Sequence, residues 1–161
     1  MRDFVKLQSD LLQKIKKSYA SSWYHTTIGD DHFISDGHIV HIIPDEHCFI
    51  DFKKLFPGSD KSFKDKIKAI ISDSDKANDL KNLRMTVESE FYGHNLAKVF
   101  YNQTTNKYIT ISADRLKGFS DKNFKGTDER SPIFIYDNET LICIVMPMQM
   151  SCEVLTKLRS I

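Results

Sequence analysis

The sequence lacks any long apolar run. No window approaches the roughly eighteen consecutive apolar residues that span a membrane, and the N-terminus, Met1-Arg2-Asp3-Phe4, has no apolar core of signal-peptide length. Cysteine is also scarce. Cys48, Cys143 and Cys152 are odd in number, far apart and outside any CxxC motif, which is typical of reduced thiols in a cytoplasm. We therefore expect a cytoplasmic protein with no membrane contact.

An excess of charge of either sign is also missing. Lys plus Arg total 23 and Asp plus Glu total 22, which leaves a formal net charge of +1. A protein that mimics DNA would be strongly acidic, and one that coats DNA non-specifically would be strongly basic. The balance therefore argues against both classes, although local basic faces would still allow a protein to encircle DNA.

Catalytic and nucleotide-binding motifs are absent from the sequence. It contains no GxxxxGK[ST], GxGxxG, GxSxG or HExxH. Its carboxylates are scattered over polar faces, with no spacing that pairs them. We therefore expect a protein that is not an enzyme, with no catalytic residues and no cofactor.

Histidines gather between positions 25 and 47. They are His25, His32, His38, His41 and His47. His38 and His41 are three apart on an expected strand and so point to opposite faces, which prevents both from binding one ion. His25 and His32 can face each other across a hairpin at Gly29, but no carboxylate or cysteine has the spacing to complete a zinc site. We expect a surface or packing role and no metal site, with a metal-dependent enzyme as the minor alternative.

Length and patterning predict a single α+β domain over residues 1–161. Within it we expect an N-terminal half 1–72, a polar surface loop 73–82, a C-terminal half 83–150 and a short tail 151–161. Apolar periodicity and turn signals predict helices at Asp3–Ser18, Ile50–Phe56 and around Phe63–Ile71, three short strands between Trp23 and Ile43, and further strands at Leu83–Phe91, Asn95–Tyr101, Lys107–Ile111, Pro132–Tyr136 and Thr140–Met146. A polar loop is expected before Pro132.

Lysines mark one face of each long helix. They are Lys14 and Lys17 on the first, and Lys61, Lys64 and Lys68 on the second, opposite the apolar residues. Such faces suit contacts with phosphates. The alternative is an ordinary solvated face, since acidic residues are interspersed.

The chain from Leu96 to Met150 has an ordered pattern of strand, turn, strand and short helix, then a loop and two more strands. The segments are LAKVFY (96–101), YITISADRL (108–116), SPIFIY (131–136) and LICIVMPMQM (141–150). This order and its ending resemble the closing module of a bacterial sliding clamp, the processivity subunit of the replicative polymerase. The resemblance implies a clamp-like antiparallel sheet of short strands with helices packed on one side. Gln149 and Met150 depart from the Arg and Leu of the clamp tail, and a clamp subunit strings three such domains together.

The clamp tail borders a groove that accepts a partner peptide. The resemblance therefore assigns partner binding to Met146, Pro147 and Met148, and flexible Met side chains suit adaptable surfaces. The alternative is that this tail is a buried edge strand. The groove hypothesis predicts that Met148→Arg leaves the fold largely intact and weakens binding.

Our leading hypothesis for function is a non-enzymatic, phage-encoded protein-binding module. It would engage a host or phage protein, in replication or in a defence system such as a CRISPR nuclease, and inhibit or redirect it. The alternative is a DNA-associated, clamp-like processivity factor formed by self-assembly, supported by the tail and the lysine faces. Fold alone does not decide between them.

Overall fold

The computed structural model describes residues 2–18, 22–56, 61–88, 95–148 and 156–158. Within them the backbone forms helices and local groups of antiparallel strands, which confirms the α+β class predicted from the sequence. The chain divides into two compact units, Met1–Ser72 and Asp73–Ile161, and the division falls at the start of the polar segment 73–82. Gln149, Met150, Cys152 and most of the expected tail lie outside the described residues.

The first unit is built on an antiparallel meander. The strands β1 (Tyr24–Ile28), β2 (Asp31–Ser35) and β3 (Ile39–Pro44) pair in that order. The turns contain Gly29 at φ +59° and Gly37 at φ +93°, a left-handed backbone that would strain any residue with a Cβ. The three strands and the hairpin at Gly29 are predicted from the sequence.

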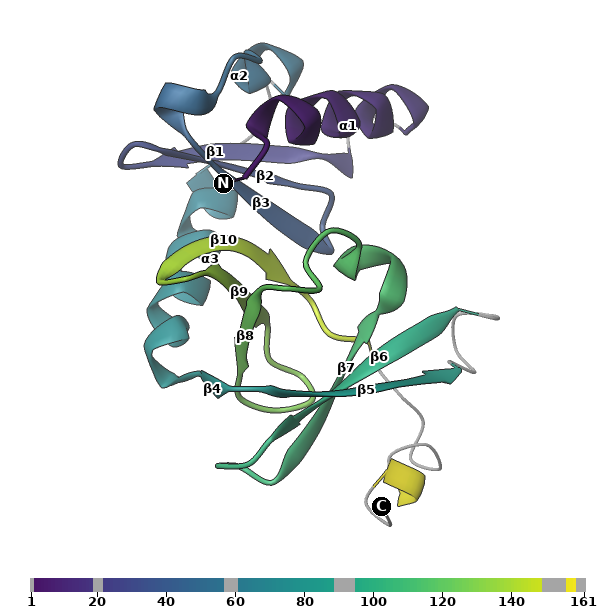
Figure 1. Ribbon diagram of the computed structural model, residues 1–161. Helices are drawn as coiled ribbons and strands as arrows, with labels where there is room; N and C mark the ends of the chain where they lie inside the picture. The colour runs from purple at the N-terminus through teal and green to yellow at the C-terminus, as the bar shows by residue number, and fades with distance from the viewer. Residues whose placement is uncertain (1, 19–21, 57–60, 89–94, 149–155, 159–161) are drawn as a thin grey trace. The chain divides into compact units, whose positions relative to one another are not determined.

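Helices α1 (Phe4–Lys17) and α2 (Phe52–Leu55) lie on the same side of this meander (Figure 1). Each begins at an aspartate whose side chain accepts a backbone N–H, Asp3 from Lys6 at 2.9 Å and Asp51 from Lys54 at 3.1 Å. The apolar faces of helices and strands meet in a core of Leu11, Ile15, Trp23, Ile34, Ile43, Phe52 and Phe56. Removing these side chains from water is the main stabilising contribution in this unit.

Helix α3 (Lys61–Asp73) contacts β1 of this meander. Strand alternation places Tyr24 on the face opposite His25, and the ring of Tyr24 lies 5.4 Å from that of Phe63.

In the second unit the strands form separate antiparallel groups. The order is β10 (Thr140–Val145), β9 (Ile133–Asp137), β8 (Asn123–Gly126) and β4 (Asn78–Asp79) in one group, and β5 (Lys81–Glu88), β6 (Leu96–Asn102) and β7 (Lys107–Ser112) in the other. Five of these strands are predicted from the sequence to within a few residues. The exceptions, β4 and β8, occur where polar loops are predicted.

The two groups pack against each other through apolar side chains. Phe100 of β6 and Phe124 of β8 have ring centroids 4.7 Å apart. Gly126 permits this close approach, because a Cβ there would lie 3.1 Å from Cδ1 of Ile109. Asn102, fully buried, donates from its side-chain amide to the Gly126 carbonyl oxygen at 3.0 Å and so fixes the end of β6 to the end of β8.

Candidate functional site

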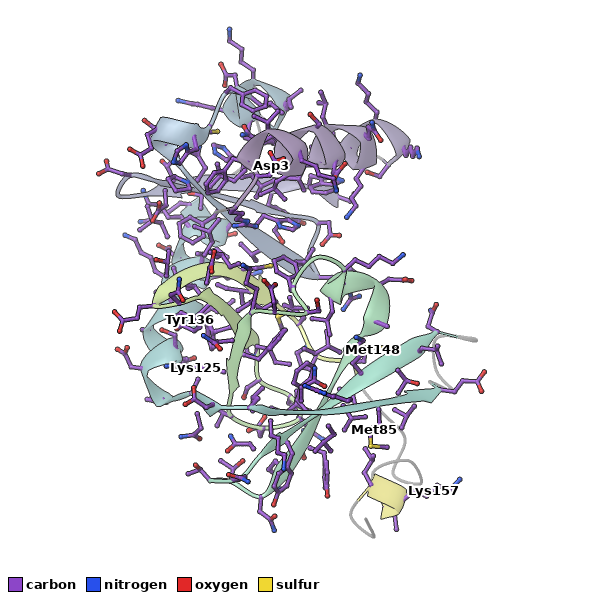
Figure 2. All side chains as sticks on the ribbon, viewed as in Figure 1. Asp3, Met85, Lys125, Tyr136, Met148 and Lys157 are labelled. Carbon is purple, nitrogen blue, oxygen red and sulfur yellow. The ribbon has the colours of Figure 1, made fainter. Side chains whose placement is uncertain are left out.

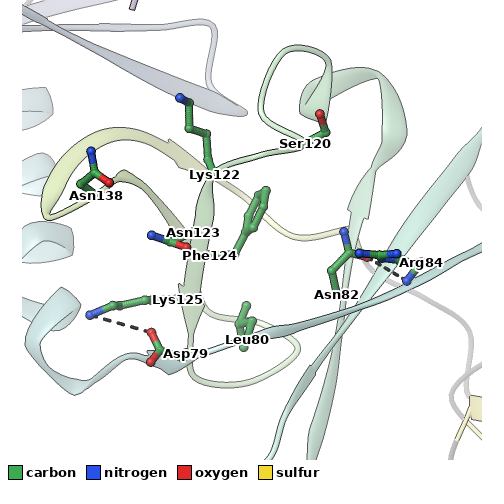
Figure 3. A pocket seen from close by; sticks show the side chains of 10 residues that line it. All are labelled: Asp79, Leu80, Asn82, Arg84, Ser120, Lys122, Asn123, Phe124, Lys125 and Asn138. Atoms are coloured by element: carbon green, nitrogen blue, oxygen red, sulfur yellow. Dashed lines mark hydrogen bonds and ion pairs between the residues drawn. The ribbon is translucent and has the colours of Figure 1, made fainter. Parts of the chain in front are cut away.

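A polar pocket opens in the second unit where the β4–β5 segment turns away from β8 (Figure 3). Its volume is about 530 Å³. The lining residues are Asp79, Leu80, Asn82 and Arg84 from β4–β5, Ser120, Lys122, Asn123, Phe124 and Lys125 from β8 and the turn before it, and Asn138 from the β9–β10 turn. Apart from Leu80 and Phe124, every lining side chain carries a charged or hydrogen-bonding group. This lining suits a polar or charged group of a ligand.

A bulge in β5 shapes one wall of the pocket. Between its pairings with Phe100 and Lys98, β5 places three residues centred on Arg84 opposite the single residue Val99. Arg84 has a φ of +53°, a left-handed conformation that is unfavourable for an arginine. Asn82 holds this conformation, since its Oδ1 accepts the backbone N–H of Arg84 at 2.8 Å. Backbone strain of this kind is concentrated at functional sites.

The two lysines of the pocket have acidic neighbours. Lys122 Nζ lies 3.3 Å from Asp137 Oδ1 and 3.7 Å from Asp121 Oδ2. Lys125 Nζ lies 4.0 Å from Asp79 Oδ1. Each lysine charge is therefore largely compensated inside the chain.

Arg84 differs from these lysines. It forms no ion pair with any residue in the described part of the chain, and its side chain is exposed. Lys125, in addition to its acidic neighbour, has its Nζ 5.1 Å from the ring centroid of Tyr136 (Figure 2). Arg84 is thus the cation of this pocket that is available to a ligand.

Neutral hydrogen-bonding groups complete the lining. Asn82, Asn123, Asn138 and Ser120 are all exposed. Asn138 has a φ of +55° in the β9–β10 turn, a conformation that Asn tolerates better than most residues. Side-chain amides and hydroxyls can donate to or accept from a ligand without adding net charge. The pocket therefore combines its charged side chains with neutral hydrogen-bonding groups.

The sequence-predicted groove residues do not line this pocket. Met148 is buried, with 6% of its surface exposed, and its backbone N–H donates to the Thr110 carbonyl oxygen at 2.8 Å. The Thr110 hydroxyl donates in return to the Met148 carbonyl oxygen at 3.1 Å. Met146 and Pro147 are half-buried, and the Met146 carbonyl accepts from Arg115 at 3.3 Å. The side chain of Met148 is therefore buried, and the assignment of these three residues to partner binding stays a prediction.

The lysines considered for nucleic-acid contact lie on the helices of the first unit. Lys14, Lys17, Lys61 and Lys68 are exposed and Lys64 is half-buried. None of them forms an ion pair with a described residue, and none lines the pocket of the second unit. Two separate lysine faces therefore remain available on α1 and α3.

The histidines form a hydrogen-bonded chain. His25 Nε2 lies 2.9 Å from His32 Nδ1, and His32 Nε2 lies 2.7 Å from Asp45 Oδ1, which confirms that these two rings face each other across the hairpin. His38 is exposed, whereas His41 is buried. Among the described residues no three His, Cys, Asp or Glu side chains converge as metal ligands would.

Burial is the main cause of the shifted pKa values of His25, His41 and Cys48. It lowers the pKa of His25 to about 4, with His32 adding to the effect. It lowers the pKa of His41 to about 3, with the positive charge of Arg2 adding further. Burial also raises the pKa of the Cys48 thiol, which disfavours the reactive thiolate. At neutral pH these groups are therefore uncharged members of a packed core.

The pocket residues were missed by sequence reasoning. Arg84 lies in a predicted strand, and residues 122–125 lie in a predicted loop. The one sequence signal that could have indicated an irregular backbone at Arg84 is Asn82. An Asn side chain often accepts the backbone N–H two residues later and so forms a tight turn.

In comparisons with known proteins, no protein-family model, curated protein or solved structure matches this chain. The resemblance to the clamp module therefore depends on residues 96–150 of the sequence alone. In the described part of the chain, no helix has both the length and the apolar character needed to cross a membrane.

Proposed function

We propose that the chain is a non-enzymatic protein-binding module, and that the pocket of the second unit is its partner-binding surface. The observation that carries the proposal is the lining of this pocket. It combines Arg84, which has no ion pair in the described part of the chain, with several exposed neutral donors. Arginine is enriched at protein interfaces and among the residues that dominate their binding energy.

The charge balance of the pocket favours a protein partner over a nucleic acid. Phosphate backbones are held by several uncompensated cations, and the counterions released supply much of the affinity. Here Lys122 and Lys125 each lie within 4.0 Å of a carboxylate of the chain itself. A surface with a single uncompensated cation is poorly suited to a polyanion.

The resemblance of residues 96–150 to the clamp module supports a partner in replication or defence. We propose that binding inhibits or redirects this partner, and that the chain is phage-encoded. Both statements depend on the sequence pattern, whereas the position of the binding surface depends on the pocket.

Affinity capture with matched variants tests the proposal. The tagged wild type, Arg84→Glu and Lys68→Glu are incubated with nuclease-treated lysate of the source cells. The two substitutions change the net charge equally, and both positions are exposed. We expect the wild type and Lys68→Glu to retain the same protein, and Arg84→Glu to lose it. Equal retention by all three would show that the pocket is not the binding surface.

A second candidate function is a DNA-associated, clamp-like factor formed by self-assembly. The observation in its favour is the pair of lysine faces on α1 and α3, which have no ion pairs among the described residues. Light scattering with circular and linear duplex DNA separates this function from the first. A closed assembly held on circular DNA and lost from linear DNA would support it, and a monomer or dimer indifferent to DNA would exclude it.

A further inference from the structure

We propose that the pocket recognises the carboxylate of an Asp or Glu side chain on the partner, with Arg84 as the anchoring group. The inference rests on the proposed function and adds the chemical class of the group that enters the pocket. It follows from the charge, the donor chemistry and the backbone of the lining.

The charges around the pocket single out Arg84. Lys122 has two acidic neighbours, Asp137 at 3.3 Å and Asp121 at 3.7 Å, and Lys125 has Asp79 at 4.0 Å. Arg84 has no such neighbour among the described residues. A carboxylate on the partner would pair with this one cation, whereas a phosphate group, which carries about −1.5 to −2 at neutral pH, would bring a larger excess of negative charge.

The types of donor in the pocket suit a carboxylate. A guanidinium presents a planar fork of N–H groups that binds both carboxylate oxygens at once. Each carboxylate oxygen accepts more than one hydrogen bond, and the amides of Asn82, Asn123 and Asn138 lie in the same lining as further donors. The hydroxyl of Ser120 adds another. An apolar side chain would leave these groups without partners.

The backbone at Arg84 is unfavourable for arginine, and the fold does not explain its presence. The left-handed conformation suits Gly or Asn better. Arg84 is exposed and has no ion pair with a described residue, so neither packing nor an internal salt bridge accounts for it. The bulge and the bond from Asn82 instead fix the segment that carries the guanidinium at the pocket wall. Recognition of a ligand would account both for the left-handed backbone at Arg84 and for its exposed guanidinium, which has no ion pair among the described residues.

A titration of the full chain with short peptides tests the inference. The probes are the capped peptide Thr-Leu-Glu-Leu-Thr, its Gln analogue and its phosphoserine analogue, together with inorganic phosphate. We expect saturable NMR shift changes at the Arg84 guanidinium and at the side-chain amides of Asn82, Asn123 and Asn138 with the Glu peptide. Affinity should be at least about tenfold lower for the Gln peptide and for the Arg84→Gln protein. Lys68→Gln should bind the Glu peptide as the wild type does.

The other outcomes overturn the carboxylate assignment in different ways. Tighter binding of phosphate or of the phosphoserine peptide would show a phosphate site. Shifts confined to the lysine faces of α1 and α3 would show non-specific charge attraction. Absence of any saturable shift, with Arg84→Gln still folded by the dispersion of its spectrum, would show that the pocket does not hold a carboxylate. The capture result with Arg84→Glu would be unaffected by that last outcome, so failure of this inference and failure of the proposed function remain distinguishable.

Discussion

His25 Nε2 lies 2.9 Å from His32 Nδ1, and His32 Nε2 lies 2.7 Å from the Asp45 carboxylate. The carboxylate accepts the Nε2 proton of His32, which leaves the lone pair of a neutral His32 on Nδ1 to accept the N–H of His25. The chain of hydrogen bonds is therefore complete when both rings are neutral.

Acidification should destabilise the fold through its buried histidines. The pKa of His25 is lowered to about 4 and that of His41 to about 3, mainly by burial, from an ordinary value of 6.5. Below pH 6.5 the unfolded chain binds more protons than the folded chain, so the free energy of unfolding falls as pH falls toward 4. The loss is up to ~1.4 kcal/mol per pH unit for each histidine.

Urea unfolding between about pH 7.5 and pH 5 measures this loss. His41→Leu removes one titrating group, and we expect the free energy of unfolding to depend less steeply on pH in this variant. An unchanged pH dependence would show that His41 does not contribute to the acid sensitivity.

Gln8 should be a key polar residue of the first unit. Fully buried on α1, it accepts the backbone N–H groups of Phe49 at 3.0 Å and Ile50 at 3.3 Å, and it donates to the His47 carbonyl oxygen at 2.8 Å. Gln8→Leu leaves these groups without partners and should lower the free energy of unfolding by ~2–3 kcal/mol. Gln13→Leu, the same change at an exposed position of the same helix, should cost less than ~0.5 kcal/mol. Equal effects in denaturant titrations would contradict the role of Gln8.

Met148→Arg should destabilise the second unit strongly. Met148 is 6% exposed and its backbone is bonded to Thr110, so the arginine charge would be buried without a partner. We expect a loss of at least ~3 kcal/mol in the free energy of unfolding. This is the opposite of what the groove hypothesis from the sequence predicts. Thermal unfolding decides between the two expectations, and Met146→Arg, at a half-buried position, should cost less.

Arg84→Asn should stabilise the protein while abolishing partner binding. Asn adopts the left-handed conformation at position 84 at lower energetic cost than Arg, so the free energy of unfolding should rise by up to ~1 kcal/mol. Paired measurements of unfolding and of capture from lysate check both parts. A variant that is less stable than the wild type would indicate that Arg84 supports the fold, which would remove the functional explanation for its strained backbone.

Much of the fold follows from local signals in the sequence. Helix α1 has regular apolar spacing and begins at the capping residue Asp3. The strands β1 to β3 are separated by turns that contain glycines with positive φ. The strand β8 was not predicted because it has four residues, of which only Phe124 is a buried large side chain. The contact of α3 with Tyr24 was also beyond prediction, because it joins residues 39 positions apart that no local pattern connects.

The pocket could not be predicted because its residues come from separate segments. Arg84, Lys122 and Asn138 approach one another only through the bulge in β5 and the pairing of β4 with β8. The decisive property is that two lysines are compensated and Arg84 is not. That property depends on distances to particular aspartates, which no spacing in the sequence reveals.

Site-specific photo-crosslinking tests most directly whether the pocket binds a protein. A photoreactive amino acid replaces Asn123 in the pocket in one variant and Lys68 on α3 in another, and both variants are irradiated in nuclease-treated lysate of the source cells. We expect a discrete adduct with a partner protein at position 123 and none at position 68. A protein adduct at position 68 alone would contradict the proposed function. Crosslinks to nucleic acid in lysate without nuclease, with no crosslink to protein, would contradict it as well.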